Sequence, residues 1–194
     1  MLYRSFASFL LVIMALYLGA CSSVVFKQPV GNAVEDEEQV QKLAGVWSTG
    51  PSEEVIFVQP LESGNIVIGG LSWKADQKKF VVKQATGVVT ELDGDYYINL
   101  LDSEDPKVKD KYFVIRAKTS ESKGHHLVLF PLDYTTFKQA VENGNLEGDI
   151  SSGGGNSVTL TGSKNQIDDF MKQQMNHKFD LDDTIVVERV GEID

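Results

Sequence analysis

Cys21 is the only cysteine among the 194 residues of the chain. A single cysteine cannot form a disulfide within the chain or build a thiolate metal site. It follows Leu18, Gly19 and Ala20, at the end of an apolar run over residues 6–17 that is preceded by the basic residue Arg4. The run is shorter than the roughly 20 apolar residues that a membrane-spanning helix needs. This arrangement is typical of an N-terminal targeting segment.

The sequence Leu18-Gly19-Ala20-Cys21 resembles the lipobox of bacterial lipoproteins. The resemblance implies that residues 1–20 are a signal peptide removed before Cys21, and that the Cys21 sulfur is lipidated. It also implies a diacylglyceryl group and usually an N-acyl chain, and two or more chains anchor a protein stably. We therefore expect attachment to a membrane by lipid rather than by a spanning segment. An ordinary secretory signal cut after Ala20 is the alternative.

The same resemblance predicts a location in the cell envelope. Ser22 follows the cysteine, where an aspartate would resemble an inner-membrane retention signal. In a Gram-negative source this favours the outer membrane, and its periplasmic face in preference to the cell surface. In a Gram-positive source the expected place is the outer face of the cytoplasmic membrane.

Other side chains that could bind a metal lack the necessary spacing. His125 and His126 are adjacent in a predicted strand, so their side chains point to opposite faces, and His177 stands apart. The acidic clusters lack the glycine and glutamate of a calcium-binding EF-hand loop and are read as solvated loops; they are Asp102, Glu104 and Asp105, and Asp180, Asp182 and Asp183. The sequence thus predicts no metal site.

Motifs for catalysis are also missing. The glycine-rich stretch at residues 152–156 lacks the Lys-Ser/Thr of a phosphate-binding loop, and no Gly-x-Ser-x-Gly elbow occurs. Carboxylates are too numerous in so acidic a chain to single out an acid–base pair. The sequence supports no particular enzymatic activity and no cofactor.

The charge balance excludes one class of partner. Removing residues 1–20 takes away one of 18 basic residues, Arg4, and leaves 17 against 28 acidic residues, a net charge of −11. Proteins that bind nucleic acid carry the opposite bias. Nucleic acid is therefore not expected as a partner.

The chain divides into three parts. Residues 1–20 form the signal peptide, and residues 21–42 are expected to form the lipidated N-terminus and an acidic tether containing Glu35-Asp36-Glu37-Glu38. About 20 flexible residues would reach roughly 25 Å. The acidic run is read as a solvated spacer or as the first turn of a short helix. Residues 43–194 are long enough for one globular domain with its own core.

Short runs rich in Val, Ile, Phe and Tyr, separated by turn residues, predict a mostly β domain. We expect an antiparallel meander or a partly closed β-barrel of about eight to ten strands, with two amphipathic helices packed on it. The predicted strands are Glu54–Gln59, Asn65–Trp73, Lys79–Gln84, Gly87–Leu92, Tyr96–Leu101, Lys111–Lys118, His126–Leu132, Leu146–Ile150, Val158–Gly162 and Thr184–Val190.

Two helices are predicted from capping residues and helical spacing. Asp133 or Thr135 can cap the first, which Asn143-Gly144 ends, and Ser163 with Gln166 resembles a capping box for the second. The side chains expected to be buried against the sheet are Phe137, Val141, Ile167, Phe170 and Met171.

Several predicted strands are apolar on both faces, for example Val55-Ile56-Phe57-Val58 and Tyr112-Phe113-Val114-Ile115. A sheet with one wet face would alternate more cleanly, so both faces must be covered. The two helices could cover the second face. Alternatively, a closed barrel with an apolar interior could leave room for a ligand.

Gly45-Val46-Trp47 resembles the Gly-x-Trp opening of the lipocalin family. The resemblance implies that Gly45 and Trp47 lie at the floor of a barrel that binds small apolar molecules. It covers some five residues, and later lipocalin signatures are missing. A buried tryptophan in an unrelated barrel is the alternative.

Two functions remain open at this point. One is a non-enzymatic accessory or interaction module, anchored by lipid, that docks onto an envelope protein. The other is a lipocalin-like barrel that binds an apolar small molecule. The first requires a filled interior with an exposed apolar surface or sheet edge, and the second requires an accessible apolar cavity. The predicted covering helices favour the accessory role.

Overall fold

The computed structural model describes residues 22–50, 55–74, 78–101, 110–119, 126–151, 156–173, 179 and 184–192. The lipobox residues Leu18, Gly19, Ala20 and Cys21 lie outside this part of the chain.

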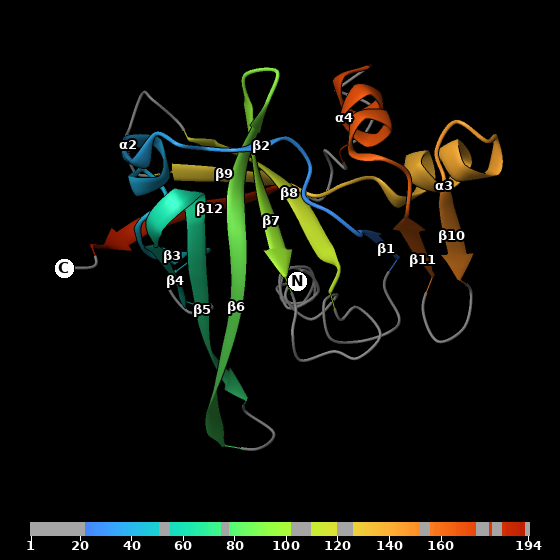
Figure 1. The fold of residues 1–194 in the computed structure, drawn as a ribbon. Coiled ribbons are helices and arrows are strands. Elements are labelled where there is room, and N and C mark those ends of the chain that lie inside the picture. Colours follow the sequence, from blue (N-terminus) through green and yellow to red (C-terminus); the bar gives the residue numbers. More distant parts are fainter. Residues whose placement is uncertain are drawn as a thin grey trace.

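Eight strands form a closed antiparallel barrel (Figure 1). Seven follow one another as a meander, and the eighth, β12, pairs with both β9 and β3, while β8 also pairs with β9. The mostly β barrel predicted from the sequence is confirmed. The strands are β3 (Gly45–Ser48), β4 (Val55–Pro60), β5 (Asn65–Lys74), β6 (Lys79–Leu92), β7 (Asp95–Leu101), β8 (Tyr112–Thr119), β9 (His126–Phe130) and β12 (Ile185–Gly191).

One strand of the barrel is longer than predicted. Lys79–Gln84 and Gly87–Leu92 were expected as two strands, but β6 runs unbroken through 14 residues. It pairs with β5 from Lys79 to Val88 and with β7 from Thr86 to Leu92, so the two ladders overlap across the expected break. Continuous backbone pairing on one side or the other therefore leaves no break at Ala85-Thr86.

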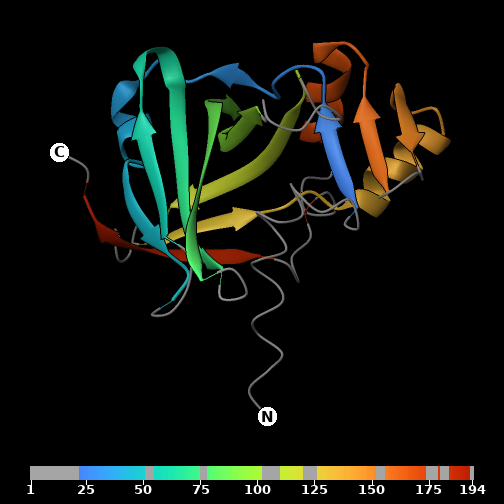
Figure 2. The same ribbon diagram turned by 90° about the horizontal axis from the view of Figure 1, so that it is seen from below.

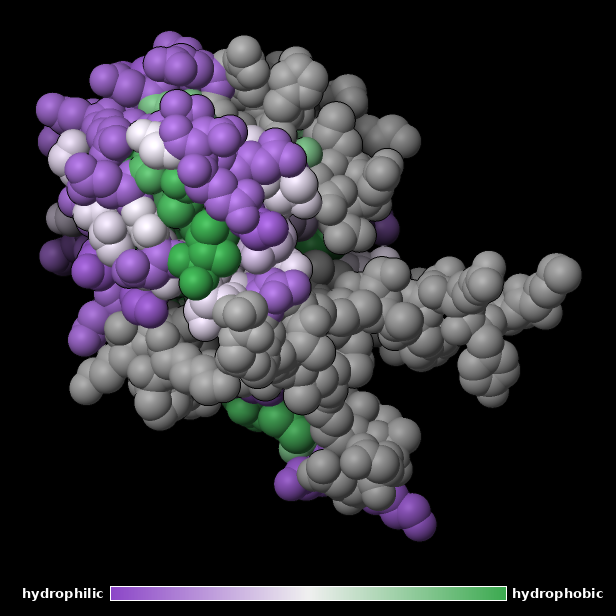
Figure 3. All heavy atoms as spheres, turned by 90° about the vertical axis from the view of Figure 1, so that its right-hand side faces the viewer, coloured by the Kyte–Doolittle hydropathy of each residue, from purple (hydrophilic) through white to green (hydrophobic). Residues whose placement is uncertain are grey.

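A second group of elements lies beside the barrel (Figure 2). β1 (Ser23–Phe26) pairs antiparallel with the start of β8 and parallel with β11 (Ser157–Leu160), which pairs with β10 (Gly148–Ser151). The helices α3 (Tyr134–Glu142) and α4 (Lys164–Lys172) flank this small sheet. On the side of the molecule that they occupy, the described residues are mostly hydrophilic at the surface, with one narrower apolar strip (Figure 3).

The helix ends follow the predicted capping chemistry. The Asp133 carboxylate accepts hydrogen bonds from the backbone N–H groups of Thr135 and Thr136, and the Ser163 hydroxyl accepts one from Gln166. Gly144 follows the first helix with a φ of +73°, a conformation that glycine adopts without strain. Local sequence therefore fixes where both helices begin and where α3 ends.

Residues 22–41 were expected to form an extended tether, and this expectation is wrong for the described residues. They form β1, the two-residue strand β2 (Asn32–Ala33), which pairs with β6, and the short helix α2 (Glu37–Gln41). Phe26 and Val30 are fully buried. The apolar residues that alternate with polar ones in this stretch supply enough burial to fix it to the domain.

Polar contacts also hold this N-terminal segment. The Val30 N–H donates to Oδ1 of Asn99 at 2.8 Å, and the Thr90 hydroxyl donates to the Val30 carbonyl oxygen. The Gly31 N–H donates to Oδ1 of Asp168 on α4 at 2.9 Å. Buried polar groups that are all paired in this way fix the path of the backbone as well as its position.

The protein has two hydrophobic cores, one inside the barrel and one outside it. Neighbouring residues of β8 divide between them, because Phe113 faces the barrel interior and Val114 faces the core under α3 and α4. A strand such as β8 is apolar on both faces because each of its faces packs into a different core. The helices do not cover every outer face, since Phe57 on β4 points outward and is 40% exposed.

Three of the five helix residues predicted to be buried are so, namely Phe137, Ile167 and Met171. Val141 and Phe170 pack against the same outer core but are only half-buried, so the prediction was wrong in extent for these two. They lie at the edges of the apolar stripes, where the helix surface turns toward solvent.

Candidate functional site

The barrel interior is lined by apolar side chains from all eight strands. Because successive residues of a strand point to opposite faces, each strand contributes every second residue. The lining includes Trp47, Val58, Ile66, Val89, Ile98, Phe113, Ala117, Leu127 and Val187. Its chemistry suits an apolar ligand or a packed core.

One end of the barrel is closed around Trp47. This side chain is 1% exposed, and its indole N–H donates to the Leu43 carbonyl oxygen at 2.9 Å. Val40 of α2 and Leu43 belong to the same core and are also buried. The segment that leads into β3 therefore covers this end of the barrel.

Arg189 completes the closed end. Its guanidinium carbon lies 4.8 Å from the centre of the Trp47 ring, and its Nη2 donates to the Lys42 carbonyl oxygen at 2.5 Å. Such stacking of a cation on an aromatic face is attractive, and more so away from water. Arg189 thereby connects the last strand to the first strand and to the segment before it.

Gly45 gives Arg189 the space that it occupies. A Cβ at this position would lie 3.0 Å from the Gly191 carbonyl oxygen and 3.4 Å from Nε of Arg189, and the φ of Gly45 is +137°. A residue with a side chain would be strained there. The two residues predicted for the barrel floor, Gly45 and Trp47, thus both lie beside Arg189 at the closed end.

The opposite end of the barrel is less filled. Leu129 and Ile185 lie next to or at the strand ends away from α2, and each packs against the interior core while remaining half-buried. This is the end from which the hairpin of β5 and β6 projects (Figure 1). The side chains of Leu129 and Ile185 are less completely buried than Trp47 and Leu43 at the closed end.

Gly70 on β5 has open space beside it at the same end. It pairs with Ile56 on β4 and with Lys83 on β6, and a Cβ added to Gly70 would meet no atom within 4 Å. Directly paired residues share a face, so Gly70 faces the interior with Ile56. The neighbouring Gly69 faces outward, where an added Cβ would lie 3.9 Å from the Cβ of Phe57.

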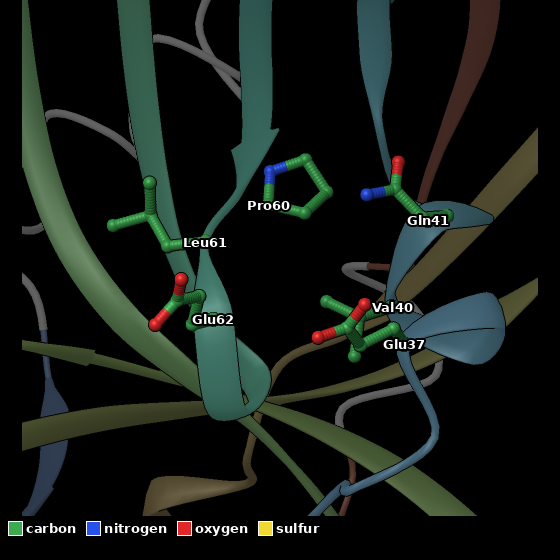
Figure 4. A pocket seen from close by; sticks show the side chains of 6 residues that line it. All are labelled: Glu37, Val40, Gln41, Pro60, Leu61 and Glu62. Carbon is green, nitrogen blue, oxygen red and sulfur yellow. The ribbon is translucent and has the colours of Figure 1, made fainter.

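A separate cavity of about 250 Å³ lies on the outside, between α2 and the 3-10 helix η1 (Glu62–Gly64). Figure 4 shows its lining from two sides, with Pro60, Leu61 and Glu62 facing Glu37, Val40 and Gln41 of α2. Leu61 is 48% exposed. The cavity combines an apolar surface with two carboxylates, a pairing suited to a group that is both apolar and basic.

The outer core contains a buried charge that the sequence did not predict. The Arg116 guanidinium donates to Oδ1 of Asp95 at 2.6 Å and lies 5.1 Å from the centre of the Phe179 ring and 5.6 Å from that of Phe130. Nearby, burial raises the pKa of the Tyr97 hydroxyl, and the Asp95 carboxylate raises it further. This cluster fixes Phe179 against β7 and β8.

Arg116 and Arg189 have the same signal in the sequence. Each follows a run of apolar residues within its strand, although β8 also contains Lys118 and β12 contains Glu188. A charge that is buried in such a strand is costly unless it is paired. An arginine in such a position is therefore expected to have a charged or aromatic partner. The partners come from distant parts of the chain and could not be read from the strand itself.

The metal-ligating residues considered above mostly lie outside the described part of the chain. Of the three histidines only His126 is described, in β9. Within the described residues, no group of three or more His, Cys, Asp or Glu side chains is placed to hold a metal ion. None of the helices in that part is both long and apolar enough to cross a bilayer.

Comparison with protein-family models, with curated proteins and with solved structures gave no match to this chain.

Proposed function

We propose that the protein is a lipid-anchored envelope protein whose barrel binds an apolar small molecule in the half away from α2. The observation that carries this proposal is Gly70, which lies on the inward face of β5 and has open space beside it. The half-buried Leu129 and Ile185 support access from the same end. Binding sites for small molecules are typically apolar cavities of this kind, with few polar groups.

The residue that is paired with Gly70 suggests a ligand class. Lys83 is paired with Gly70 across β5 and β6 and is half-buried. An ammonium group at the rim of an apolar cavity would attract the head group of an acid. The proposed ligand is therefore a long-chain fatty acid or a similar apolar molecule that ends in an anionic group.

The proposed anchor is a lipid on Cys21, attached to the membrane at the periplasmic face of the outer membrane if the source is Gram-negative. β1 begins at Ser23, two residues after this cysteine, and it is built into the sheet. A bilayer attached at Cys21 would therefore be close to the folded domain. The reach of roughly 25 Å that about 20 flexible residues would give does not apply, because only Ser22 lies between Cys21 and β1.

The test uses two adjacent glycines that face opposite sides of β5. Gly70→Leu should fill the proposed cavity and lower the affinity for a fluorescent long-chain fatty acid by at least about tenfold. Gly69→Leu adds the same side chain on the outer face and should leave binding unchanged. Equal affinity of Gly70→Leu and the unsubstituted protein, or saturable binding by neither, would remove the ligand-binding proposal.

A second candidate function is the accessory role, and the outer cavity between α2 and η1 favours it. Its carboxylates Glu37 and Glu62 flank the apolar Val40 and Leu61, which suits an arginine or lysine side chain on an envelope protein. Crosslinking in intact cells followed by mass spectrometry would identify such a partner. Leu61→Asp should abolish the crosslink, while the control Lys172→Asp on α4 should not.

A further inference from the structure

The hairpin of β5 and β6 extends beyond the rest of the barrel (Figure 1). β4 pairs with β5 only as far as Leu71, and β7 pairs with β6 only from Thr86 onward. The residues of β6 from Lys79 to Ala85 therefore have β5 as their only neighbouring strand in the described part of the chain. This outer half of the hairpin projects away from the end covered by α2.

Its outward face is apolar and exposed. Val82 is 75% exposed and Phe80 is 64% exposed, the two highest values among the large hydrophobic residues of the described chain. The two alternate with Lys79, Val81 and Lys83, so they lie on the same face of β6. Figure 3 shows an apolar surface on the projecting part, with hydrophilic residues beyond it.

The charge of the hairpin is opposite to that of the protein. Residues 71–84 contain four lysines, at positions 74, 78, 79 and 83, against the single aspartate at position 76. The whole chain has a net charge of −10. A strongly acidic protein is repelled by an anionic surface except where basic residues gather, and Lys78 and Lys79 directly precede the exposed Phe80.

We infer that the outer half of the β5–β6 hairpin docks onto an anionic phospholipid bilayer. Phe80 and Val82 enter the interfacial region, and the lysines reach the head groups, as long basic side chains do beside buried apolar surface. The inference does not depend on a ligand inside the barrel. It orients the less filled end of the barrel toward the membrane.

The test places a probe on the hairpin and a matched probe elsewhere. Val82→Cys and Val186→Cys each replace an exposed valine, and Val186 lies on β12 with 52% of its side chain exposed. The full chain as isolated is labelled with a polarity-sensitive maleimide dye and bound to vesicles of phosphatidylcholine, with or without phosphatidylglycerol. The unsubstituted chain, treated identically, reports any label on Cys21.

We expect the dye at position 82 to shift to the blue and to be shielded from iodide only on vesicles that contain phosphatidylglycerol, while the dye at 186 stays accessible. Lys78→Glu with Lys79→Glu should weaken this docking by at least about fivefold for each lysine. Equal iodide access at 82 and 186 on anionic vesicles would overturn the inference. So would equal shielding on phosphatidylcholine alone, because the lysines would then have no part in docking.

Discussion

The guanidinium of Arg189 lies on the face of the Trp47 ring, with 4.8 Å between its central carbon and the ring centre. Arg189 is in the last strand of the barrel in chain order and Trp47 in the first, and the two residues are paired directly where these strands meet. Its hydrogen bond to the Lys42 carbonyl oxygen adds the segment after α2. Arg189 therefore connects three segments of the chain at the closed end of the barrel.

Replacing that side chain should destabilise the protein. Arg189→Ala removes the stacking on Trp47 and the hydrogen bond to Lys42, and should lower the free energy of unfolding by about 2–4 kcal/mol. Arg189→Lys keeps a cation but not the planar group and should lose less of the free energy of unfolding.

Denaturant unfolding measures both variants. Lys172→Ala, at an exposed position on α4, is the control and should change stability by less than about 0.5 kcal/mol. An effect of Arg189→Ala as small as the control's would show that the closed end does not depend on Arg189.

Two phenylalanines of the outer core should differ in their contributions to stability. Phe137 is fully buried and contacts the rings of Phe26 and Phe170, with centroid distances of 6.0 and 5.7 Å. Phe137→Ala should cost about 3–5 kcal/mol, and Phe170→Ala less, about 1–3 kcal/mol, because Phe170 is only half-buried. Equilibrium unfolding in urea decides the order. Equal losses of unfolding free energy in the two variants would contradict the expectation that the more exposed Phe170 contributes less.

Stability should fall at alkaline pH because of Tyr97. Burial and Asp95 raise its pKa above the ordinary value of 10.0. Above that pH the unfolded chain releases the Tyr97 proton while the folded protein keeps it, so unfolding becomes easier by about 1.4 kcal/mol per pH unit. Below about pH 10 the Tyr97 hydroxyl is protonated in both states, and its contribution to the free energy of unfolding is fully present.

The variant Tyr97→Phe isolates this effect from other groups that titrate in the same range. Urea unfolding between about pH 9 and 11 should show a shallower decline in the variant than in the unsubstituted protein. Parallel curves would assign the alkaline loss of stability to other groups, among them Tyr96, whose pKa burial also raises.

The proposed anchor leads to a test in cells. Cys21→Ser should leave the domain folded, because β1 begins after this position, and should release the protein from the membrane or block its processing. Membrane fractionation with an antibody against the domain measures the distribution. A processed variant that still sediments firmly with the membrane would refute lipidation at Cys21. The variant Ser22→Ala, one residue further on, is the matched control and should remain attached.

Much of the β architecture could be predicted from the sequence because it depends on local patterns. Short runs rich in Val, Ile, Phe and Tyr indicated the strands of the meander from β4 onward, although β3 was not among the predicted strands. Asp133 and Ser163 indicated the helix starts, and Asp93-Gly94 indicated the turn between β6 and β7. Each of these signals is complete within a few residues, so no distant contact is needed to read it.

The sequence by itself determined the class of fold, the helix caps and the apolar character of the barrel interior, since these follow from residue types at short spacing. Only the tertiary structure decided that β12 closes the ring between β9 and β3, and that residues 22–41 belong to the domain. It alone paired Arg189 with Trp47 and left open space beside Gly70. The physical reason is that ring closure, charge pairing and unfilled volume depend on side chains far apart in the sequence, and local propensity carries no information about such distances.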